Sequence, residues 1–338
     1  MGKTMAFYAS AMDRRTILKS LGAVAAGAAF SKFSFAAGPT AKPFNGLFPI
    51  ASTPFTQDNK LDFDCLNNEV RFCNRGGVPG LIWPQIASGW STLSADERFA
   101  GAESMIAAGK GGKTAIVIGV QTQGKDLPGA IAYAKHAAKN GADAICSLPP
   151  EGDNAAVMEY YKAIGAATDL PLFVQTIGDM SVDLVVDMYK AIPTIRVVKD
   201  EAGDPLQRVT ELRAKTDGKL AVFAGKGVRQ MMDEMRLGFT GFCPTVGMAD
   251  LFQQSWELYE AGKIRESYDM FGRIQAFSTI TNADRYVMVA RGIFKEDTKS
   301  RPTPGMGSSA GPQPPLTEAD KKVVREALNT YLKPYLRG

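Results

Sequence analysis

Thr114-Ala-Ile-Val-Ile-Gly-Val120 is almost wholly apolar, as expected of a parallel strand that is buried on both faces. Residues 127–140 then follow a helical period and end before Gly141, a residue type that is favoured just after a helix. A second apolar run, 144–148, comes next. We therefore predict a strand, a helix and a second strand parallel to the first.

The same unit recurs along the chain after residue 37. The predicted strands are Gly46–Ala51, Gly80–Trp83, Thr114–Val120, Ala144–Leu148, Leu172–Gln175, Arg196–Lys199, Leu220–Ala224 and Gly241–Thr245. The predicted helices are Phe63–Arg75, Ala95–Ala108, Leu127–Asn140, Ala155–Thr168, Val182–Ile192, Pro205–Lys215, Val228–Leu237 and Leu251–Ala261. Strict alternation of eight such pairs predicts an α/β fold, the (β/α)8 TIM barrel.

A doubly wound sheet is the alternative arrangement of these units. It usually carries a glycine-rich phosphate-binding turn after its first strand, whereas this chain has Pro49-Ile-Ala-Ser-Thr-Pro54 there. We place the barrel at residues 37–262. Helical periodicity continues through residues 263–338, interrupted by the Pro/Gly/Ser-rich segment 301–315. We interpret 263–338 as a C-terminal helical extension packed on the barrel.

The N-terminal segment carries the charge imbalance of the chain. Five Lys or Arg residues stand against one Asp in residues 1–36, which accounts for the whole net charge of +4. The balanced remainder argues against a nucleic-acid partner, which would need a clustered basic surface.

Residues 1–36 resemble a twin-arginine signal peptide. Asp13-Arg-Arg-Thr-Ile-Leu-Lys19 precedes the weakly apolar stretch 21–30, and Ser34-Phe-Ala36 places small residues where a signal peptidase reads. The apolar stretch is shorter than the ~20 residues that span a bilayer. The resemblance implies export to the periplasm, with no membrane association after removal of the signal. A disordered or amphipathic arm is the alternative.

The cysteines are expected to be buried free thiols. Cys65 and Cys73 lie about 12 Å apart on one predicted helix at ~1.5 Å per residue, too far for a disulfide. Cys146 and Cys243 lie in predicted strands. Because His136 is the one histidine in the chain, no Cys/His metal-binding spacing is present. We expect neither a metal nor another cofactor.

In a TIM barrel, functional side chains gather at the carboxyl ends of the strands, where the βα loops converge on one mouth. The reactive side chains that follow the predicted strands here are Ser52, Thr53, Ser88, Gln121, Glu151, Gln175, Lys199, Lys226 and Thr245.

Lys199 is the candidate nucleophile. Two valines precede it in a buried strand, and apolar surroundings should lower the pKa of the amine, leaving the neutral form that attacks a carbonyl. A structural lysine paired with Asp200 or Glu201 is the alternative. Lys226 is a rival nucleophile, but the glycines on both sides of it indicate an exposed loop.

Five segments come in an order and spacing that resemble a known family. They are Gly46-Leu-Phe-Pro-Ile-Ala-Ser-Thr-Pro-Phe55, Leu93-Ser-Ala-Asp-Glu-Arg98, Gly141-Ala-Asp-Ala-Ile-Cys-Ser-Leu-Pro-Pro150, Thr168-Asp-Leu-Pro-Leu172 and Val198-Lys-Asp-Glu-Ala-Gly-Asp204. From Gly46 to its C-terminus the chain resembles the dihydrodipicolinate synthase / N-acetylneuraminate lyase family of pyruvate-dependent class I aldolases. The resemblance implies that Lys199 forms a Schiff base with a 2-oxo acid, and that the protein is a homodimer or homotetramer.

The chain departs from the family after strand two. The family's Gly-Thr-Thr-Gly-Glu loop holds the carboxylate of the 2-oxo acid, whereas this chain reads Gln85-Ile-Ala-Ser-Gly-Trp90. Ser88 and Gly89 could supply a hydroxyl and backbone donors, or Ser88 could serve only the turn. The predicted substrate-binding residues are Ser52, Thr53, Ser88, Gly89, Gln175 and Thr245.

A second departure follows strand four. The family places a proton-relaying tyrosine there, whereas this chain has Pro149-Pro-Glu-Gly152. We predict that Glu151 acts as the general acid or base. Alternatively, Tyr160 or Tyr161 reaches into the site, or Glu151 is a solvated loop residue. The arginine with which dihydrodipicolinate synthases bind a second carboxylate has no counterpart in 151–158, so lysine biosynthesis is not expected.

These expectations define an exported carbon–carbon or carbon–oxygen lyase of the class I aldolase type, acting on pyruvate or a larger 2-oxo acid. One alternative is a hydratase-aldolase or sugar-acid dehydratase that uses the same lysine. Another is a non-catalytic periplasmic binding protein on the same scaffold.

Overall fold

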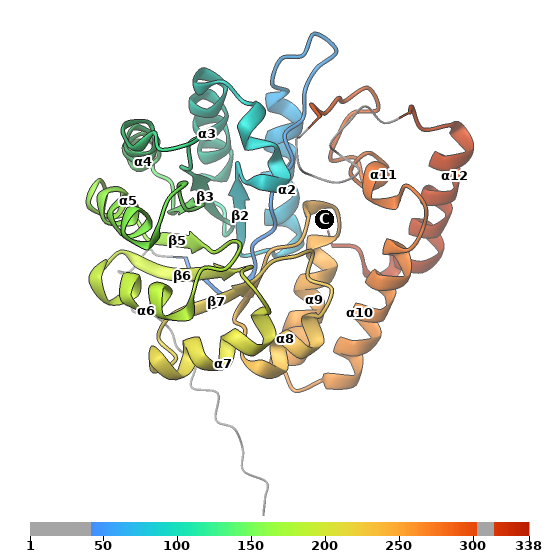
Figure 1. Ribbon diagram of the computed structural model, residues 1–338. Coiled ribbons are helices and arrows are strands. Elements are labelled where there is room, and N and C mark those ends of the chain that lie inside the picture. Colours follow the sequence, from blue (N-terminus) through green and yellow to red (C-terminus); the bar gives the residue numbers. More distant parts are fainter. Residues whose placement is uncertain (1–41, 303–313, 338) are drawn as a thin grey trace, which may run out of the picture. The chain divides into compact units, whose positions relative to one another are not determined.

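The computed structural model describes residues 42–302 and 314–337, so the predicted signal peptide lies outside the described residues. Eight parallel strands pair in the order β1-β8-β7-β6-β5-β4-β3-β2 (Figure 1). They are β1 Gly46–Leu47, β2 Gly80–Trp83, β3 Ala115–Gly119, β4 Ala144–Ser147, β5 Leu172–Gln175, β6 Ile195–Asp200, β7 Ala221–Ala224 and β8 Gly241–Phe242. Ile50 forms parallel bridges to both Ile82 and Thr245. The strands thus form a nearly closed barrel, which confirms the predicted fold.

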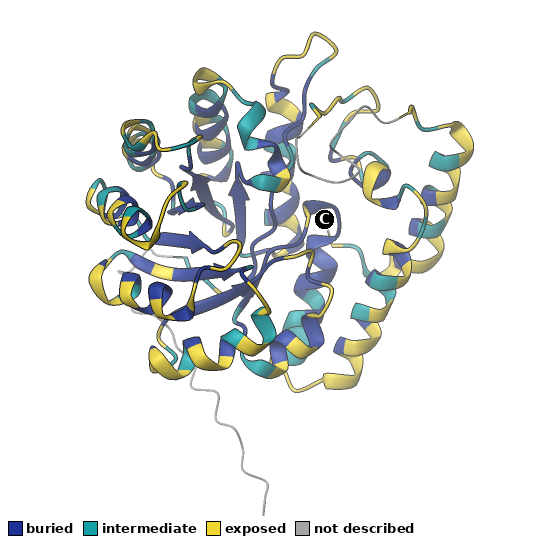
Figure 2. Cartoon of the chain, viewed as in Figure 1, coloured by how far each residue is buried: buried dark blue, intermediate teal, exposed yellow. Residues whose placement is uncertain are grey.

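Helices alternate with the strands and cover the barrel from outside. They are α2 Phe63–Gly76, α3 Ala95–Gly109, α4 Leu127–Asn140, α5 Asn154–Ala166, α6 Val182–Ala191, α7 Pro205–Lys215, α8 Met231–Leu237 and α9 Ala249–Glu260. Figure 2 shows the strands buried, apart from exposed Arg196 in β6, and the outer faces of these helices exposed. The extension adds α10 Ile264–Ser278, α11 Ala283–Ala290 and α12 Glu318–Ala327.

Local sequence signals set several of the helix ends. Ser94 accepts from the backbone N–H of Glu97, whose carboxylate in turn accepts from the backbone N–H of Ser94, which is the reciprocal capping box expected there. Gly141 follows α4 with a φ of 86°, a left-handed conformation that favours glycine. These ends lie where the sequence predicts them.

Three predicted boundaries differ from the observed ones by more than two residues. The first and last strands are shorter than predicted because Pro49 and Pro244 lack the N–H that a strand ladder needs. Helix α8 begins at Met231 instead of Val228. The preceding residues, Lys226 to Val228, all have positive φ values and form a turn that cannot belong to a right-handed helix.

Three phenylalanine rings fill the barrel interior. Phe48 packs on Phe223 with ring centroids 5.1 Å apart, and Phe173 lies 5.9 Å from Phe48 and 5.6 Å from Phe223. Two of the rings need a glycine opposite them: a Cβ on Gly80 would lie 2.0 Å from Phe48, and one on Gly241 would lie 2.3 Å from Phe223. The interior is therefore a packed core and not a channel.

A buried ion pair joins the extension to the barrel. Asp250, in the first turn of α9, accepts two hydrogen bonds of 2.7 and 2.8 Å from Arg291, which follows α11. The side chains of the pair are 0% and 1% exposed. The backbone N–H of Arg337 also donates to Asp250, at 2.9 Å. One carboxylate thus contacts two parts of the extension.

Among the described residues, no helix is both long and apolar enough to cross a bilayer.

We predict that Asp250→Ala lowers the free energy of unfolding by about 3–5 kcal/mol, because it removes the carboxylate that accepts two hydrogen bonds from the buried Arg291 guanidinium. Urea unfolding would measure this loss. Asp233→Ala is the matched control, because it breaks the exposed Asp233–Arg236 pair and should cost about 1 kcal/mol or less. Similar losses in both variants would contradict the role of the buried pair.

Candidate active site

Lys199 lies at the carboxyl end of β6, where the sequence predicts it. Side chains alternate along a strand, and Phe173 and Val197 belong to the interior cluster. Gln175 and Lys199, two residues further on, continue these inward rows and pair with each other across β5 and β6. Lys199 is only 4% exposed. Its amine therefore stands just above the packed interior.

A carboxylate contacts this amine. Nζ of Lys199 lies 2.8 Å from Oε2 of Glu201, and Nε2 of Gln175 donates to the same oxygen at 2.5 Å. The backbone N–H of Lys226 donates to the other oxygen of Glu201 at 2.9 Å. Of the two acids that the sequence offers as ion-pair partners, Glu201 is the one in contact with Lys199. The carboxylate of Asp200 instead binds Arg208 at 3.0 Å.

The groups around the amine of Lys199 differ in protonation state. Burial by itself raises the pKa of Glu201, but the nearby charge and hydrogen bond of Lys199, together with hydrogen bonds from Lys226 and Gln175, outweigh it and leave this pKa below its ordinary value. Glu201 is therefore a carboxylate near neutral pH. Burial raises the pKa of Cys146 to about 12, so this thiol is protonated and is a poor competitor as a nucleophile. All four cysteines are free and buried, as expected.

The turn after β7 is shaped around Glu201. A Cβ on Gly225 would lie 1.8 Å from Oε1 of Glu201, so a larger residue there would displace the carboxylate. Lys226, which follows, is exposed, and its own Nζ donates to the carbonyl of Gly203 at 2.9 Å. This rival lysine thus occupies the exposed loop that its flanking glycines indicate. Val228 has a φ of 54°, which is rare for a β-branched residue.

Two predicted substrate-binding hydroxyls bind the protein itself. Thr53 donates to the carbonyl of Ser88 at 2.6 Å and accepts from the indole N–H of Trp83 at 3.0 Å. Ser88 donates to the carbonyl of Ala51 at 2.5 Å, and Gly89 closes the turn with a φ of 67°. These bonds hold the loop after β2 against the end of β1.

Other predicted residues are more open. Ser52 is partly buried, and its backbone N–H donates to Glu69 at 2.9 Å. Thr245 and Glu151 are exposed. In residues 42–302 and 314–337, Glu151 makes no hydrogen bond or ion pair and is not brought to Lys199. From the sequence, Glu201 was expected only as a structural ion-pair partner of Lys199. Its position two residues beyond Lys199, where the strand ends, was the one signal for its contact.

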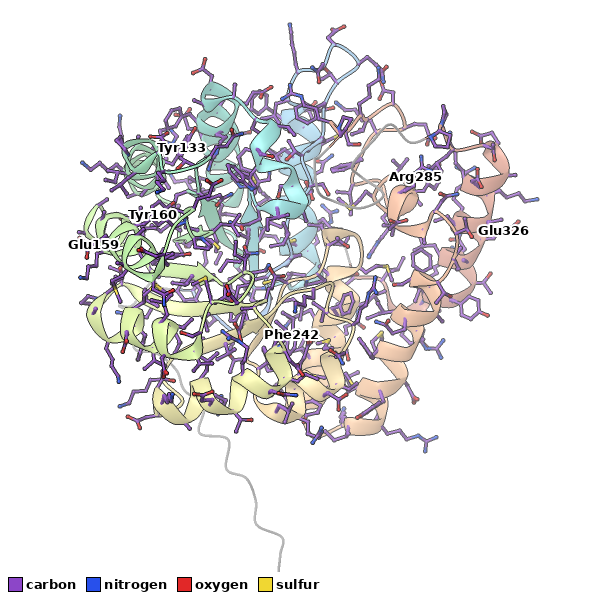
Figure 3. The ribbon with its side chains drawn as sticks, in the orientation of Figure 1. Tyr133, Glu159, Tyr160, Phe242, Arg285 and Glu326 are labelled. Atoms are coloured by element: carbon purple, nitrogen blue, oxygen red, sulfur yellow. The ribbon has the colours of Figure 1, made fainter. Side chains whose placement is uncertain are left out.

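The two tyrosines of α5 do not reach the amine. The hydroxyl of Tyr160, labelled in Figure 3, lies 2.8 Å from that of Ser147, and Tyr161 donates to the carbonyl of Ser147 at 2.7 Å. Burial raises the pKa of Tyr160 to about 12. Both hydroxyls are therefore protonated and held at the outer side of β4, so neither stands in for the tyrosine that the family places after strand four.

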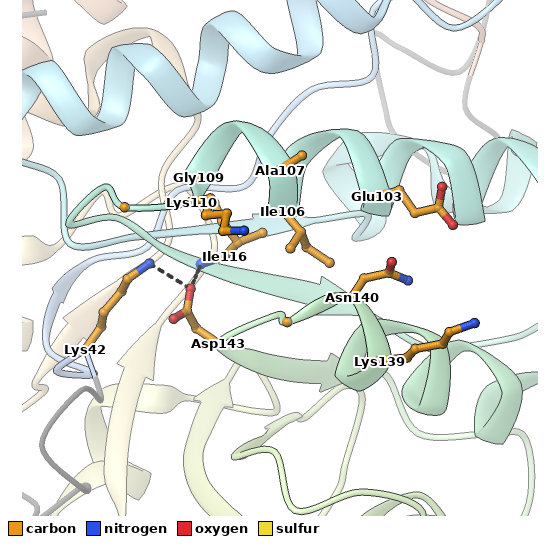
Figure 4. Close-up of a pocket in the computed structure, with 12 residues that line it drawn as sticks. Lys42, Glu103, Ile106, Ala107, Gly109, Lys110, Ile116, Lys139, Asn140 and Asp143 are labelled. Atoms are coloured by element: carbon orange, nitrogen blue, oxygen red, sulfur yellow. Dashed lines mark hydrogen bonds and ion pairs between the residues drawn. The ribbon is translucent and has the colours of Figure 1, made fainter.

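A cavity of about 540 Å³ lies at the other end of the barrel (Figure 4). It is lined by residues that precede β3 and β4, among them Asp143, whose carboxylate accepts from Lys42 at 3.0 Å and from the backbone N–H of Ile116 at 2.8 Å. In TIM barrels the residues at this amino-terminal end contribute to stability, whereas active sites lie at the opposite, carboxyl-terminal end. We therefore place the candidate active site at Lys199. Within the described ranges, no cluster of three or more His, Cys, Asp or Glu residues is suited to a metal.

We predict that Thr53→Val lowers the free energy of unfolding by about 1–3 kcal/mol, because it leaves the Trp83 N–H and the Ser88 carbonyl buried without this partner. Chemical denaturation would measure the loss. Ser52→Ala is the control: its hydroxyl makes no hydrogen bond within the described part of the chain, so the change should stay within about 0.5 kcal/mol. A Thr53→Val protein as stable as wild type would show that these bonds are not structural.

The sequence pattern of the Dihydrodipicolinate synthetase family matches residues 43–324. The 4-hydroxy-tetrahydrodipicolinate synthase of Methanosarcina mazei is 27% identical over 191 residues, which cover 54% of this chain and 64% of that relative. The chain thus matches just under two thirds of the relative's length.

Solved structures show the same fold. N-acetylneuraminate lyase from Mycoplasma synoviae superposes with a TM-score of 0.72 at 19% identity, covering 86% of this chain and 98% of that one. A prophage protein of the dihydrodipicolinic acid synthase family from E. coli K12, solved in complex with pyruvate, gives 0.69 at 19% identity, covering 85% and 98%. From its sequence match and its barrel, the chain belongs to the Dihydrodipicolinate synthetase family.

Proposed function

We propose that this protein is a Schiff-base-forming lyase or aldolase that acts on pyruvate or a larger 2-oxo acid. The observation that carries the proposal is the place of Lys199: a buried amine at the carboxyl end of β6, directly above the packed interior and 2.8 Å from a carboxylate. The family neighbour solved with pyruvate supports a 2-oxo acid as the ligand.

Lys199 supplies the nucleophile of this proposed reaction. Its Nζ attacks the carbonyl carbon of the 2-oxo acid, and loss of water leaves a protonated imine. The imine withdraws electrons from the neighbouring carbon, so that a carbon–carbon bond can break or form there, or a hydroxyl can leave. A hydratase-aldolase or a sugar-acid dehydratase would use the same first step. None of these reaction steps uses a metal ion.

The proposal separates this protein from lysine-biosynthetic 4-hydroxy-tetrahydrodipicolinate synthase, the activity named for its curated relatives. Both tyrosines of α5 are bound to Ser147. Residues 151–158 contain no arginine to bind a second carboxylate. We therefore propose a different second substrate. The proposal also includes export by the twin-arginine route and assembly into a dimer or tetramer.

Incubation of the mature protein with pyruvate and borohydride should reduce the imine to a stable adduct on Lys199, because borohydride traps a protonated imine as a secondary amine. Peptide mass spectrometry would locate the adduct. Lys199→Arg keeps the positive charge but should give no adduct, since a guanidinium is not a nucleophile at neutral pH. Absence of an adduct from the wild type with pyruvate and several larger 2-oxo acids would overturn the covalent mechanism and favour a binding protein.

Replacement of Arg14 and Arg15 by lysine should retain the protein in the cytoplasm, because the proposed export signal depends on the arginine pair. Cell fractionation and immunoblotting would compare it with the wild type, which we expect in the periplasm. Arg71→Lys, an exposed change on α2, is the control. Equal periplasmic amounts of the Arg14/Arg15 variant and the wild type would contradict the twin-arginine route.

A further inference from the structure

We infer that Glu201 is a catalytic residue, the group that takes a proton from Nζ of Lys199 and returns it to the leaving hydroxyl during imine formation. The inference rests on the proposed function and deepens it. It assigns to Glu201 the proton transfer that the sequence led us to expect of Glu151. The observations that carry it are the contact of Glu201 with the reacting nitrogen, the way its carboxylate is held, and the engagement of the other candidate groups.

The contact places an acid–base group on the reacting atom. Oε2 of Glu201 lies 2.8 Å from Nζ of Lys199, within the range over which a general base takes a proton directly. Glu151, by comparison, is exposed in the loop after β4. Proton transfer requires this geometry before any matching of pKa values.

The carboxylate is held in one orientation. Its Oε2 receives Nζ of Lys199 and the amide of Gln175, and its Oε1 receives the backbone N–H of Lys226. The lack of a side chain at Gly225 leaves the space that Oε1 occupies. Elements β5, β6 and the turn after β7 thus converge on this one side chain, as expected of a pre-organised catalytic group.

Glu201 also connects the buried amine with solvent. Its side chain is 18% exposed, whereas that of Lys199 is 6% exposed. A proton taken from the amine can therefore reach water through the carboxylate. This arrangement differs from a fully enclosed ion pair, in which neither partner could exchange its proton.

Other acids and phenols near this end of the barrel are engaged elsewhere. Asp200 binds Arg208 and Thr176, and the phenols of Tyr160 and Tyr161 bind Ser147. Among the described residues, Glu201 is the carboxylate that forms an ion pair with Lys199.

The proton steps balance. Starting from the ion pair, Glu201 takes one proton from Nζ, and the amine lone pair forms a bond to the carbonyl carbon while the carbonyl π electrons move to oxygen. A proton moves from nitrogen to this oxygen and gives the carbinolamine. Glu201 then returns its proton to the hydroxyl, which leaves as water as the nitrogen lone pair forms the C=N bond. The protonated imine keeps the single positive charge, and Glu201 is again a carboxylate.

The test measures how fast the borohydride-trapped pyruvate adduct forms in the mature protein. Glu201→Gln should form the adduct on Lys199 at least about 10²-fold more slowly than wild type, the usual size of a general acid–base contribution. Glu159→Gln, an exposed change on α5, is the matched control and should react at the wild-type rate. Circular dichroism would confirm that each variant is folded.

Two further variants keep the inference open to refutation. Glu201→Asp preserves the charge but shortens the side chain, so it should react at an intermediate rate even if Glu201→Gln fails to fold. Formate added to Glu201→Ala should recover part of the lost rate, because it supplies a carboxylate to the emptied space. A wild-type rate in Glu201→Gln or Glu201→Asp would overturn the inference, as would slowing in Glu151→Gln alone.

The same assay separates this inference from the function on which it rests. An adduct in the wild type but no slowing in the Glu201 variants would refute the role of Glu201 and leave the Schiff-base mechanism standing. No adduct in the wild type with pyruvate or larger 2-oxo acids would refute both.

Discussion

The filling of the barrel interior is the constraint on which the rest of this structure depends. Phe48, Phe173 and Phe223 occupy the space between the strands, and glycines opposite Phe48 and Phe223 admit those two rings. Because these rings fill the interior, the next inward-facing positions on β5 and β6, Gln175 and Lys199, lie at the mouth of the barrel. A polar side chain there meets other loop residues and not the opposite wall, which is how Lys199 comes to face Glu201.

The two interpretations of Lys199 that the sequence left open are compatible. The lysine is an ion-pair partner of Glu201, and the same pairing places a proton acceptor on the nitrogen that must lose protons to react. A wholly apolar surrounding would supply a neutral amine but no route for its proton. The mixed surrounding observed here, with buried thiols toward the interior and a carboxylate toward the mouth, supplies both a base and a path to solvent.

The eight strands and helices could be predicted from the sequence because apolar runs and helical periods are local patterns. Boundaries failed at Pro49 and Pro244 and at the left-handed turn 226–228, where one residue changes the hydrogen bonding or the backbone conformation. Lys199 could be found because a strand end is also local. The bonds of Thr53 to Ser88 and of Glu201 to the Lys226 backbone join residues from different loops, and no periodicity in one chain reveals such pairs.

The close approach of Gly225 to Glu201 has an evolutionary consequence. A methyl group at position 225 would occupy the place of the carboxylate, so a substitution there changes the position of Glu201 as well. A residue larger than glycine at position 225 would fit only after the Glu201 side chain had moved away from its present contacts. A shorter residue at position 201 would remove this clash. We therefore expect substitutions at positions 201 and 225 to occur together in related sequences.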